Sequence, residues 1–203
     1  MSTPPDPHRP LWMLDVDGVL NAVARRPDRG VWRDWRHGRA TADGVEWPIW
    51  FSPTVTGTVA RLHESGVVEV RWLTTWGVHA NGELRELLGV PELEVAGEPP
   101  HVTGDHGAGS HGEAVAREEP EDAGASWWKL EAVQRTLLDE PERPVIWTDD
   151  DLGGERDAVS WVERHVPRRL LVSPRPDVGL TPRQLRAIRA YCEDFADTPA
   201  DTP

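Results

Sequence analysis

Two carboxylates follow an apolar stretch near the start of the chain. The run Leu11–Leu14 is entirely apolar, and Asp15 and Asp17 come directly after it, two positions apart. Residues i and i+2 of an extended chain point to the same side, so these carboxylates converge beyond the stretch. Two like charges this close repel each other unless a cation lies between them or one of them is protonated. The pair therefore indicates a cation site or acid–base chemistry.

The same pattern has a simpler interpretation. The sequence Asp-x-Asp-Gly at residues 15–18 is also common in turns and in calcium-binding loops. The apolar run in front of it favours chemistry, because a continuous apolar run is typical of a central parallel strand buried on both faces. Open α/β sheets place their ligands beyond the carboxyl ends of such strands. Gly18 allows the sharp turn that the chain needs there.

Further polar side chains come directly after two later apolar stretches, at residues 67–73 and 144–147. They are Thr74 and Thr75 after the first stretch, and Asp149, Asp150 and Asp151 after the second. The pattern does not decide which of the two threonines ends its strand, or which of the three acids contacts a metal. All of these residues are candidates for one shared site.

Lys129 is the only lysine among the 22 Lys and Arg residues of the chain. Lysine is a compact point charge and arginine a planar fork, so the two do not replace each other in a tight site. A single lysine can also be a matter of chance. Ser126 predicts the start of a helix, and Lys129 then lies in its first turn, where anions are favoured. We treat Lys129 as a candidate anion-binding residue.

The elements that must position these residues alternate along the chain. Strands are expected at residues 11–16, 67–73, 93–95, 144–147 and 170–172, and helices at 53–65, 80–88, 127–138, 157–165 and 182–195. The alternation predicts an α/β fold, a Rossmann-like doubly wound parallel sheet with right-handed crossovers.

In such a sheet the carboxyl ends of all strands lie at one edge, so the acids, the hydroxyl and the amine can meet there. Transfer of a phosphoryl group needs this combination. A carboxylate attacks phosphorus, and Mg²⁺, which prefers oxygen ligands, offsets the repulsion between two anions. A hydroxyl group and a cation hold the equatorial oxygens.

The length of 203 residues favours a single domain, which we place at residues 11–195. Residues 1–10 are expected to be a disordered lead-in and 196–203 a frayed tail. Residues 21–50 predict a hairpin-like flap held down by its tryptophans. Residues 97–125 predict a flexible acidic insert, whose three histidines (His101, His106 and His111) fit a solvated loop better than a metal site.

The overall charge limits the classes of partner. A net charge of −13 argues against broad adhesion to nucleic acid or to an anionic membrane, although six arginines gather locally between Arg25 and Arg39. No stretch approaches the ~20 apolar residues of a membrane span, and the N-terminus has no apolar signal region. We therefore expect a cytoplasmic location. Cys192, the single cysteine, excludes an internal disulfide and a cysteine metal cluster.

The four motifs in this order resemble those of the haloacid-dehalogenase (HAD)-like hydrolase superfamily, phosphatase type. An apolar strand with Asp15-Val16-Asp17-Gly18 resembles the first motif, Trp72-Leu73-Thr74 the second, Lys129 the third, and Ile146-Trp147-Thr148-Asp149-Asp150 the fourth. The finer pattern, including Asp17–Asn21, 72–76 and 128–130, is similar to a capless subgroup that includes the HAD domain of bacterial RNA-repair proteins. Neither insert position looks like a folded cap.

The resemblance implies a HAD-like core, a Mg²⁺ cofactor and a role for each motif residue. Asp15 would be the nucleophile that forms an aspartyl-phosphate, and Asp17 the acid and base. Thr74, or Thr75, and Lys129 would bind the phosphoryl group. The metal would be held by Asp15, the backbone carbonyl of Asp17 and Asp149, with Asp150 nearby. The expected activity is hydrolysis of phosphate monoesters on a substrate of unknown class.

Other functions use some of the same residues. A phospho-acceptor signalling domain has a similar set, but its lysine comes last, whereas Lys129 precedes the final acids. A non-catalytic binding module would be expected to lack a first-motif acid or the lysine, and all are present. A polynucleotide-end phosphatase is favoured by the arginines at 25–39 and disfavoured by the net charge. Trp76, His79 and Asn81 could face the substrate or equally pack the start of a helix.

Overall fold

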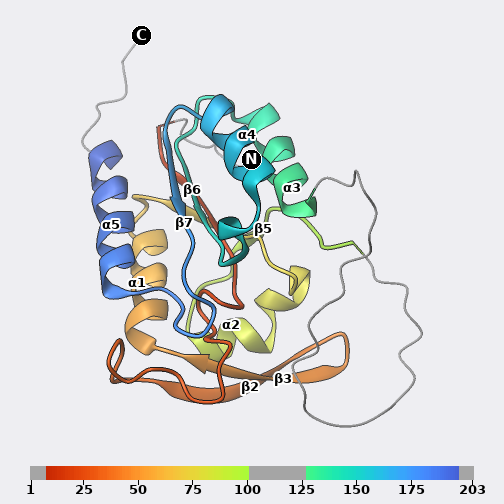
Figure 1. Ribbon diagram of the computed structural model, residues 1–203, viewed down its shortest axis with the longest axis vertical. Coiled ribbons are helices and arrows are strands. Elements are labelled where there is room, and N and C mark those ends of the chain that lie inside the picture. The colour runs from red at the N-terminus through yellow and green to blue at the C-terminus, as the bar shows by residue number, and fades with distance from the viewer. Residues whose placement is uncertain (1–7, 101–126, 197–203) are drawn as a thin grey trace.

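A computed structural model describes residues 8–100 and 127–196. Within them, a five-stranded sheet has the order β5-β4-β1-β6-β7 (Figure 1). The strands are β1 (Leu11–Leu14), β4 (Glu69–Trp72), β5 (Glu94–Val95), β6 (Val145–Thr148) and β7 (Arg169–Val172). Every neighbouring pair in this sheet is parallel. The predicted Rossmann-like parallel sheet is confirmed. Three of its strands, β1, β4 and β5, are one to three residues shorter than the segments that predicted them.

The central strand β1 separates two apolar cores, and its side chains alternate between them. Trp12 and Leu14 belong to one core, and Leu11 and Met13 to the other. This is the two-residue period of a strand buried on both faces. All four side chains are completely buried, as the continuous apolar run in the sequence predicts.

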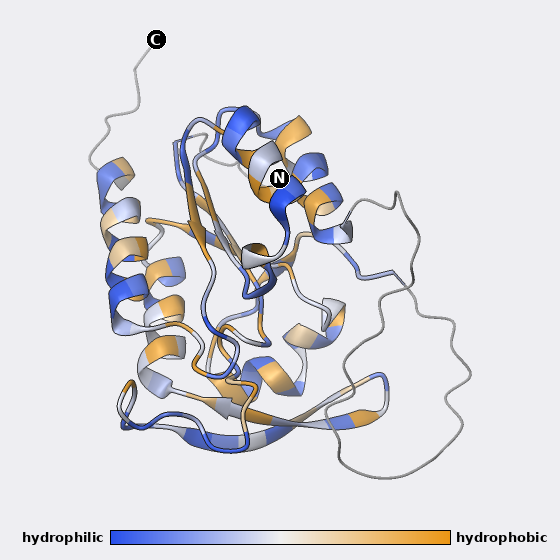
Figure 2. Cartoon of the chain, viewed as in Figure 1, coloured by the Kyte–Doolittle hydropathy of each residue, from blue (hydrophilic) through white to orange (hydrophobic). Residues whose placement is uncertain are grey.

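Helices cover both faces of the sheet (Figure 1). Helices α3 (Trp128–Asp139) and α4 (Arg156–His165) supply residues such as Val133 and Val162 to the core of Leu11 and Met13. Helices α1 (Pro53–Glu64), α2 (Glu83–Leu88) and α5 (Pro182–Ala196) supply the other core. Figure 2 shows the apolar stripe of these helices turned inward and the polar residues outward, which is the pattern of helices packed on a sheet.

A two-stranded antiparallel hairpin follows β1 in the chain and forms a separate small sheet. It consists of β2 (Arg36–Ala42) and β3 (Val45–Phe51), and it lies across the end of the molecule where α1 and α5 begin (Figure 1). Asp43 and Gly44 make its turn, both with positive φ, as two-residue hairpin turns require. The expected flap is thus a hairpin, preceded by a loop.

Several local expectations need correction. The segment expected as one helix at 80–88 is split into the 3₁₀ helix η1 (Gly77–Asn81) and α2. The tryptophans of the flap do not all pack inward, since Trp47 is 49% exposed. Most of the expected insert at 97–125, and most of the expected terminal segments 1–10 and 196–203, lie outside the described residues.

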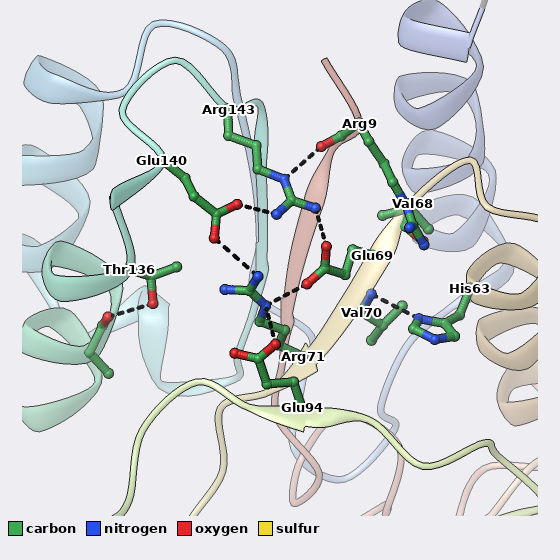
Figure 3. Close-up of polar contacts among 11 residues, drawn as sticks. Arg9, His63, Val68, Glu69, Val70, Arg71, Glu94, Thr136, Glu140 and Arg143 are labelled. Carbon is green, nitrogen blue, oxygen red and sulfur yellow. Dashed lines mark hydrogen bonds and ion pairs between the residues drawn. The ribbon is translucent and has the colours of Figure 1, made fainter. Parts of the chain in front are cut away.

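The amino ends of the strands carry a network of charged side chains (Figure 3). Arg143 donates hydrogen bonds to Glu69 at 2.6 Å, to Glu140, and to the carbonyl oxygen of Arg9 at 2.7 Å. Arg71 donates to Glu69 at 2.6 Å and to Glu140 at 3.0 Å. Two arginines thus face two glutamates, which compensates for the free energy lost when these charges leave water.

Candidate active site

Asp15, Lys129 and Asp149 form a buried cluster at the opposite edge of the sheet. The Nζ atom of Lys129 donates to Oδ2 of Asp15 and to Oδ2 of Asp149, at 2.7 Å in both cases. The three side chains are 6%, 3% and 0% exposed, respectively. The ammonium group therefore bridges two carboxylates that would otherwise repel each other in a dry environment.

The pairing of the central strands brings the two carboxylates together. Leu14, the last residue of β1, is in register with Thr148, the last residue of β6. Asp15 and Asp149 are the residues that follow them. The ladder continues into the site, because the amide of Asp15 donates to the carbonyl oxygen of Thr148 at 3.1 Å. Equivalent positions on adjacent parallel strands thus place both side chains beyond the same edge of the sheet.

Two indole rings lie close to the ammonium group of Lys129. Its Nζ lies 5.5 Å from the ring centroid of Trp127 and 5.9 Å from that of Trp128. Trp127 in turn stacks on Trp147 of β6, with ring centroids 5.2 Å apart and planes 14° apart. Rings at this distance attract an ammonium group and restrict its position. The start of α3 thus places the lysine between the two acids and beside two indole rings.

Asp150 completes an acidic group suited to a cation. Carboxylate oxygens of Asp15, Asp149 and Asp150 lie within 4.8 Å of one another. Gly18, at φ +70°, passes so close to Asp150 that an added Cβ would lie 2.2 Å from its carboxyl carbon. Three oxygen donors around one point are what a hard divalent cation requires, so the residues present fit a metal ion.

Burial and mutual repulsion shift the protonation of these acids. Burial, reinforced by the charge of Asp15, raises the pKa of Asp149 to about 8. Burial and the charges of Asp151 and Asp15 raise the pKa of Asp150 to about 7. Burial also raises the pKa of Asp15, against the opposing effect of Lys129. A bound cation would favour the ionised carboxylates and reverse these shifts.

Lys129 stays charged. Burial lowers the pKa of its ammonium group, but the charges of Asp15 and Asp149 outweigh this and raise it above its ordinary value. In the ionised state that a bound cation favours, the three acids carry more negative charge than the one lysine offsets. Such an excess attracts a divalent cation into the cluster.

Asp17 lies beside the cluster, half-buried, with its carboxylate held by two donors. The side-chain amide of Asn21 donates to Oδ1 at 2.6 Å, and the indole N–H of Trp76 donates to Oδ2 at 3.0 Å. Thr74, two residues after the end of β4, is completely buried, whereas Thr75 is exposed. The backbone amide of Trp76 donates weakly to the Thr74 hydroxyl at 3.4 Å.

Comparison with known proteins agrees with this arrangement. Residues 11–185 match the family model described as "HAD domain in Swiss Army Knife RNA repair proteins". The chain belongs to this family of HAD domains. No curated protein and no solved structure matches it significantly. The match covers all five strands of the sheet and every candidate site residue.

The HAD domain brings the sequence-predicted residues to one edge of the sheet. Asp15, Lys129, Asp149 and Asp150 gather in one cluster, and Asp17 follows Asp15 in the same turn. The exposed carboxylate of Asp151 is not part of the acidic group, but the Asp151 backbone amide donates to Asp149 at 3.0 Å. No folded cap domain occurs within the described ranges, in agreement with the capless expectation.

Two site residues were not assigned from the sequence. Asn21 stood out only as part of the first motif, and Trp76 could equally have packed a helix. The other two residues of that open choice have structural contacts. Asn81 bonds the Trp72 indole and the backbone of Leu93, and His79 pairs with Asp43 of the hairpin at 3.0 Å.

The length and hydropathy of the described helices show whether any of them could cross a membrane. None of the helices in residues 8–100 and 127–196 combines the length and the apolar character that crossing a bilayer requires.

Proposed function

We propose that this HAD domain is a Mg²⁺-dependent phosphatase that hydrolyses phosphate monoesters through an aspartyl-phosphate on Asp15. The observation that carries the proposal is the bridged cluster in which Lys129 contacts both Asp15 and Asp149 at 2.7 Å. This cluster supports the proposal because it brings a carboxylate that could act as nucleophile, an ammonium group and further acids together at the carboxyl ends of β1 and β6. Membership of a HAD family supports hydrolysis of the phosphatase type.

In the first step, a carboxylate oxygen of Asp15 attacks phosphorus and a new O–P bond forms. The bond between phosphorus and the ester oxygen breaks, and its electron pair goes to that oxygen. Asp17, protonated at this stage, gives its proton to the departing oxygen, so the alcohol leaves neutral. The products of this step are the alcohol and the phosphorylated Asp15.

In the second step, water attacks the phosphorus of the aspartyl-phosphate. Asp17, now ionised, takes a proton from the water as the new O–P bond forms. The bond between phosphorus and the Asp15 oxygen breaks and returns its electron pair to the carboxylate. Inorganic phosphate leaves, and both aspartates return to their starting protonation states.

Three other groups have supporting roles in the proposal. The Lys129 ammonium and the Thr74 hydroxyl bind the phosphoryl oxygens, Thr74 being assigned because it comes two residues after the end of β4 and is completely buried, whereas Thr75 is exposed. Asp15, Asp149 and Asp150, with the backbone carbonyl of Asp17, would hold Mg²⁺. When bound, the ion would neutralise charge on the phosphoryl group and the acids.

The direct test is hydrolysis of p-nitrophenyl phosphate by wild type and Asp15→Asn, each with Mg²⁺ and with a chelator. We expect kcat to fall by at least about 10³-fold in Asp15→Asn, because the nucleophile is lost. Asp139→Asn, at an exposed acid of α3, is the matched control and should keep wild-type activity. Activity that survives either the chelator or Asp15→Asn would contradict the proposed mechanism.

A second candidate function is the removal of phosphate from the end of a polynucleotide. The observation that favours it is a group of exposed arginines in the loop and hairpin that follow the first motif. None of them has an ion-pair partner within the described residues; they are Arg25, Arg26, Arg29, Arg33 and Arg36. Exposed arginines without an ion-pair partner could hold a phosphate backbone, and the family's description refers to RNA repair.

Salt dependence separates this candidate from a general phosphatase. In Arg25→Gln/Arg26→Gln, the salt dependence of kcat/KM on a phosphorylated oligonucleotide should weaken by a slope of about 0.7 for every phosphate that the variant no longer neutralises. Hydrolysis of p-nitrophenyl phosphate should be unchanged. Arg183→Gln/Arg186→Gln, at exposed arginines of α5, is the matched control. An equal response of both double variants would contradict the candidate.

A further inference from the structure

The carboxylate of Asp17 is held by donors from two separate segments. Asn21 Nδ2 donates to Oδ1 at 2.6 Å, and Trp76 Nε1 donates to Oδ2 at 3.0 Å. Each oxygen of the carboxylate therefore has its own N–H donor. Such a pair of bonds fixes both the position and the rotation of the carboxylate plane.

The donor from the second motif is a buried tryptophan. Trp76 is 4% exposed and lies two residues after Thr74. The backbone amide of Trp76 faces the Thr74 hydroxyl at 3.4 Å, while its indole reaches Asp17. One residue thus contacts both a proposed phosphoryl-binding group and the proposed acid and base.

The donor from the first motif is itself fixed by the hairpin. Oδ1 of Asn21 accepts a hydrogen bond from the backbone amide of Trp50 in β3 at 2.8 Å. This bond determines which end of the Asn21 amide points at Asp17, because the oxygen is turned toward β3. The backbone of Asn21 is also held, its amide donating to Val16 at 2.9 Å. The hairpin is therefore linked through Asn21 to Asp17.

Asp17 needs such support because of its neighbour. Asp15 is two residues away and its charge repels that of Asp17. A half-buried aspartate with two rotatable bonds would turn toward water in response. The two N–H donors oppose this rotation and keep the carboxylate beside the nucleophile.

We propose that Trp76 and Asn21 are positioning residues that hold Asp17 for proton transfer to the leaving group, with the hairpin orienting Asn21. The inference rests on the proposed function, in which Asp17 is the acid and base. It assigns the hairpin a role in proton transfer through one hydrogen bond, in addition to any contact with substrate.

The experiment compares an aryl ester with an alkyl ester. The alkoxide released from glycerol 2-phosphate needs a proton, whereas the p-nitrophenolate released from p-nitrophenyl phosphate leaves readily without one. The quantity measured is kcat/KM, which reports the steps up to loss of the alcohol and excludes hydrolysis of the aspartyl-phosphate. A misplaced acid therefore lowers kcat/KM on the alkyl ester more than on the aryl ester.

Trp76→Phe removes one donor and keeps an aromatic ring. We expect kcat/KM on glycerol 2-phosphate to fall about tenfold more than on p-nitrophenyl phosphate, a part of the 10²–10⁴-fold that a positioned acid supplies. Asn21→Asp keeps the acceptor for the Trp50 amide but replaces the donor with a second carboxylate. It should show the same selective loss to a greater extent.

Two further variants separate the explanations. Trp32→Phe removes an indole bond of 2.8 Å to the carbonyl oxygen of Leu180, which is not a bond to Asp17, and should leave the ratio of the two kcat/KM values unchanged. Asp17→Asn should show the largest selective loss. If Asp17→Asn lowers kcat/KM equally on both substrates, the proposed role of Asp17 is wrong, and so is the inference.

A different outcome would overturn only the positioning role. In that outcome Asp17→Asn lowers kcat/KM selectively on the alkyl ester, but Trp76→Phe and Asn21→Asp lower kcat/KM equally on both esters. The proposed function would then stand. Circular dichroism and thermal unfolding show whether each variant is folded. Where Trp76→Phe is unfolded, the result for Asn21→Asp decides, since that substitution conserves the size of the side chain.

Discussion

The two ends of the parallel sheet hold buried charges in opposite states of balance. At the amino ends, two buried arginines, Arg71 and Arg143, face the mostly buried Glu69 and Glu140, so positive and negative charges balance among these four side chains (Figure 3). At the carboxyl ends, Lys129 faces three aspartates that can gather around a cation. The balanced end connects the strands to one another. The unbalanced end retains a capacity to bind a positive ion, and it is the proposed active site.

The pKa shifts express the same difference. At the amino ends, burial alone would raise the pKa of Glu69, but the hydrogen bond and charge of Arg143 and the charge of Arg71 hold it below its ordinary value. At the carboxyl ends, burial raises the pKa of Asp149 to about 8 despite Lys129. The arginines at the amino ends keep the glutamates ionised, whereas the acids at the carboxyl ends need a further positive charge to become fully ionised.

Breaking the balanced end should produce the largest effect. Arg143→Met leaves Arg71 to face both Glu69 and Glu140, so the buried network has one negative charge in excess, and we expect a loss of about 3–5 kcal/mol in the free energy of unfolding. Urea unfolding measures it. Activity per folded molecule should stay at the wild-type level, because the network lies at the far end of the sheet.

Arg39→Met is the matched control for this change. It breaks the exposed pair with Glu46 in the hairpin and should change stability by less than about 1 kcal/mol. Equal losses in the two variants would mean that burial of the Arg143 network contributes nothing to stability.

Substitution of Lys129 tests the charge balance at the carboxyl ends of the strands. Lys129→Met should lower kcat/KM by about 10²–10³-fold, because a preorganised charge on the phosphoryl group is lost. Lys129→Arg should restore only part of the activity, since a planar fork cannot occupy the place of a point charge between two acids. Steady-state kinetics with Mg²⁺ tests both variants, and full activity in Lys129→Arg would refute the need for a lysine.

The last difference between the two ends is a pH dependence of opposite sign. Asp149 and Asp150 titrate near 3.8 when unfolded but at about 8 and about 7 in the metal-free folded chain. The folded chain then binds more protons between these values, so this end loses stability as pH rises from about 4 to about 8. Glu69, whose pKa is lowered, contributes stability that is lost only as pH falls below its ordinary value of 4.5.

Thermal unfolding across that range, with a chelator and with Mg²⁺, measures the effect at the carboxyl ends. The decline toward high pH should appear with the chelator and shrink with Mg²⁺, which stabilises the ionised acids. Asp149→Asn should reduce the decline in the chelator. A metal-free melting temperature that rises steadily toward pH 8 would contradict the assigned sign.

The sequence allowed the cluster to be predicted because its members follow strands. Register between neighbouring strands converts the positions of Asp15 and Asp149 into proximity, so apolar runs and chain order were sufficient. The same reasoning predicted the parallel sheet, whereas the hairpin-like flap was predicted from the break in this pattern at residues 21–50 and from the tryptophans there. The exact strand ends could not be predicted, since apolar runs continue into the loops that close over the core.

The contacts made by loops and by distant charges could not be predicted in this way. The bond from Trp76 to Asp17 joins residues 59 positions apart, and the pair Arg143–Glu69 joins residues 74 positions apart. Neither has a periodic signal. Each depends on the path of a loop or on the side chains that reach a sheet end, and those follow from the complete packing.

The short edge strand β5 has a consequence for behaviour at high concentration. Open strand edges can pair with other chains and begin aggregation. On this side of the sheet, the edge is limited to Glu94 and Val95, and the carboxylate of Glu94 is largely exposed beside Arg71. A brief, charged edge gives little template for another strand. This side of the sheet is therefore protected against the self-association that a longer apolar edge would promote.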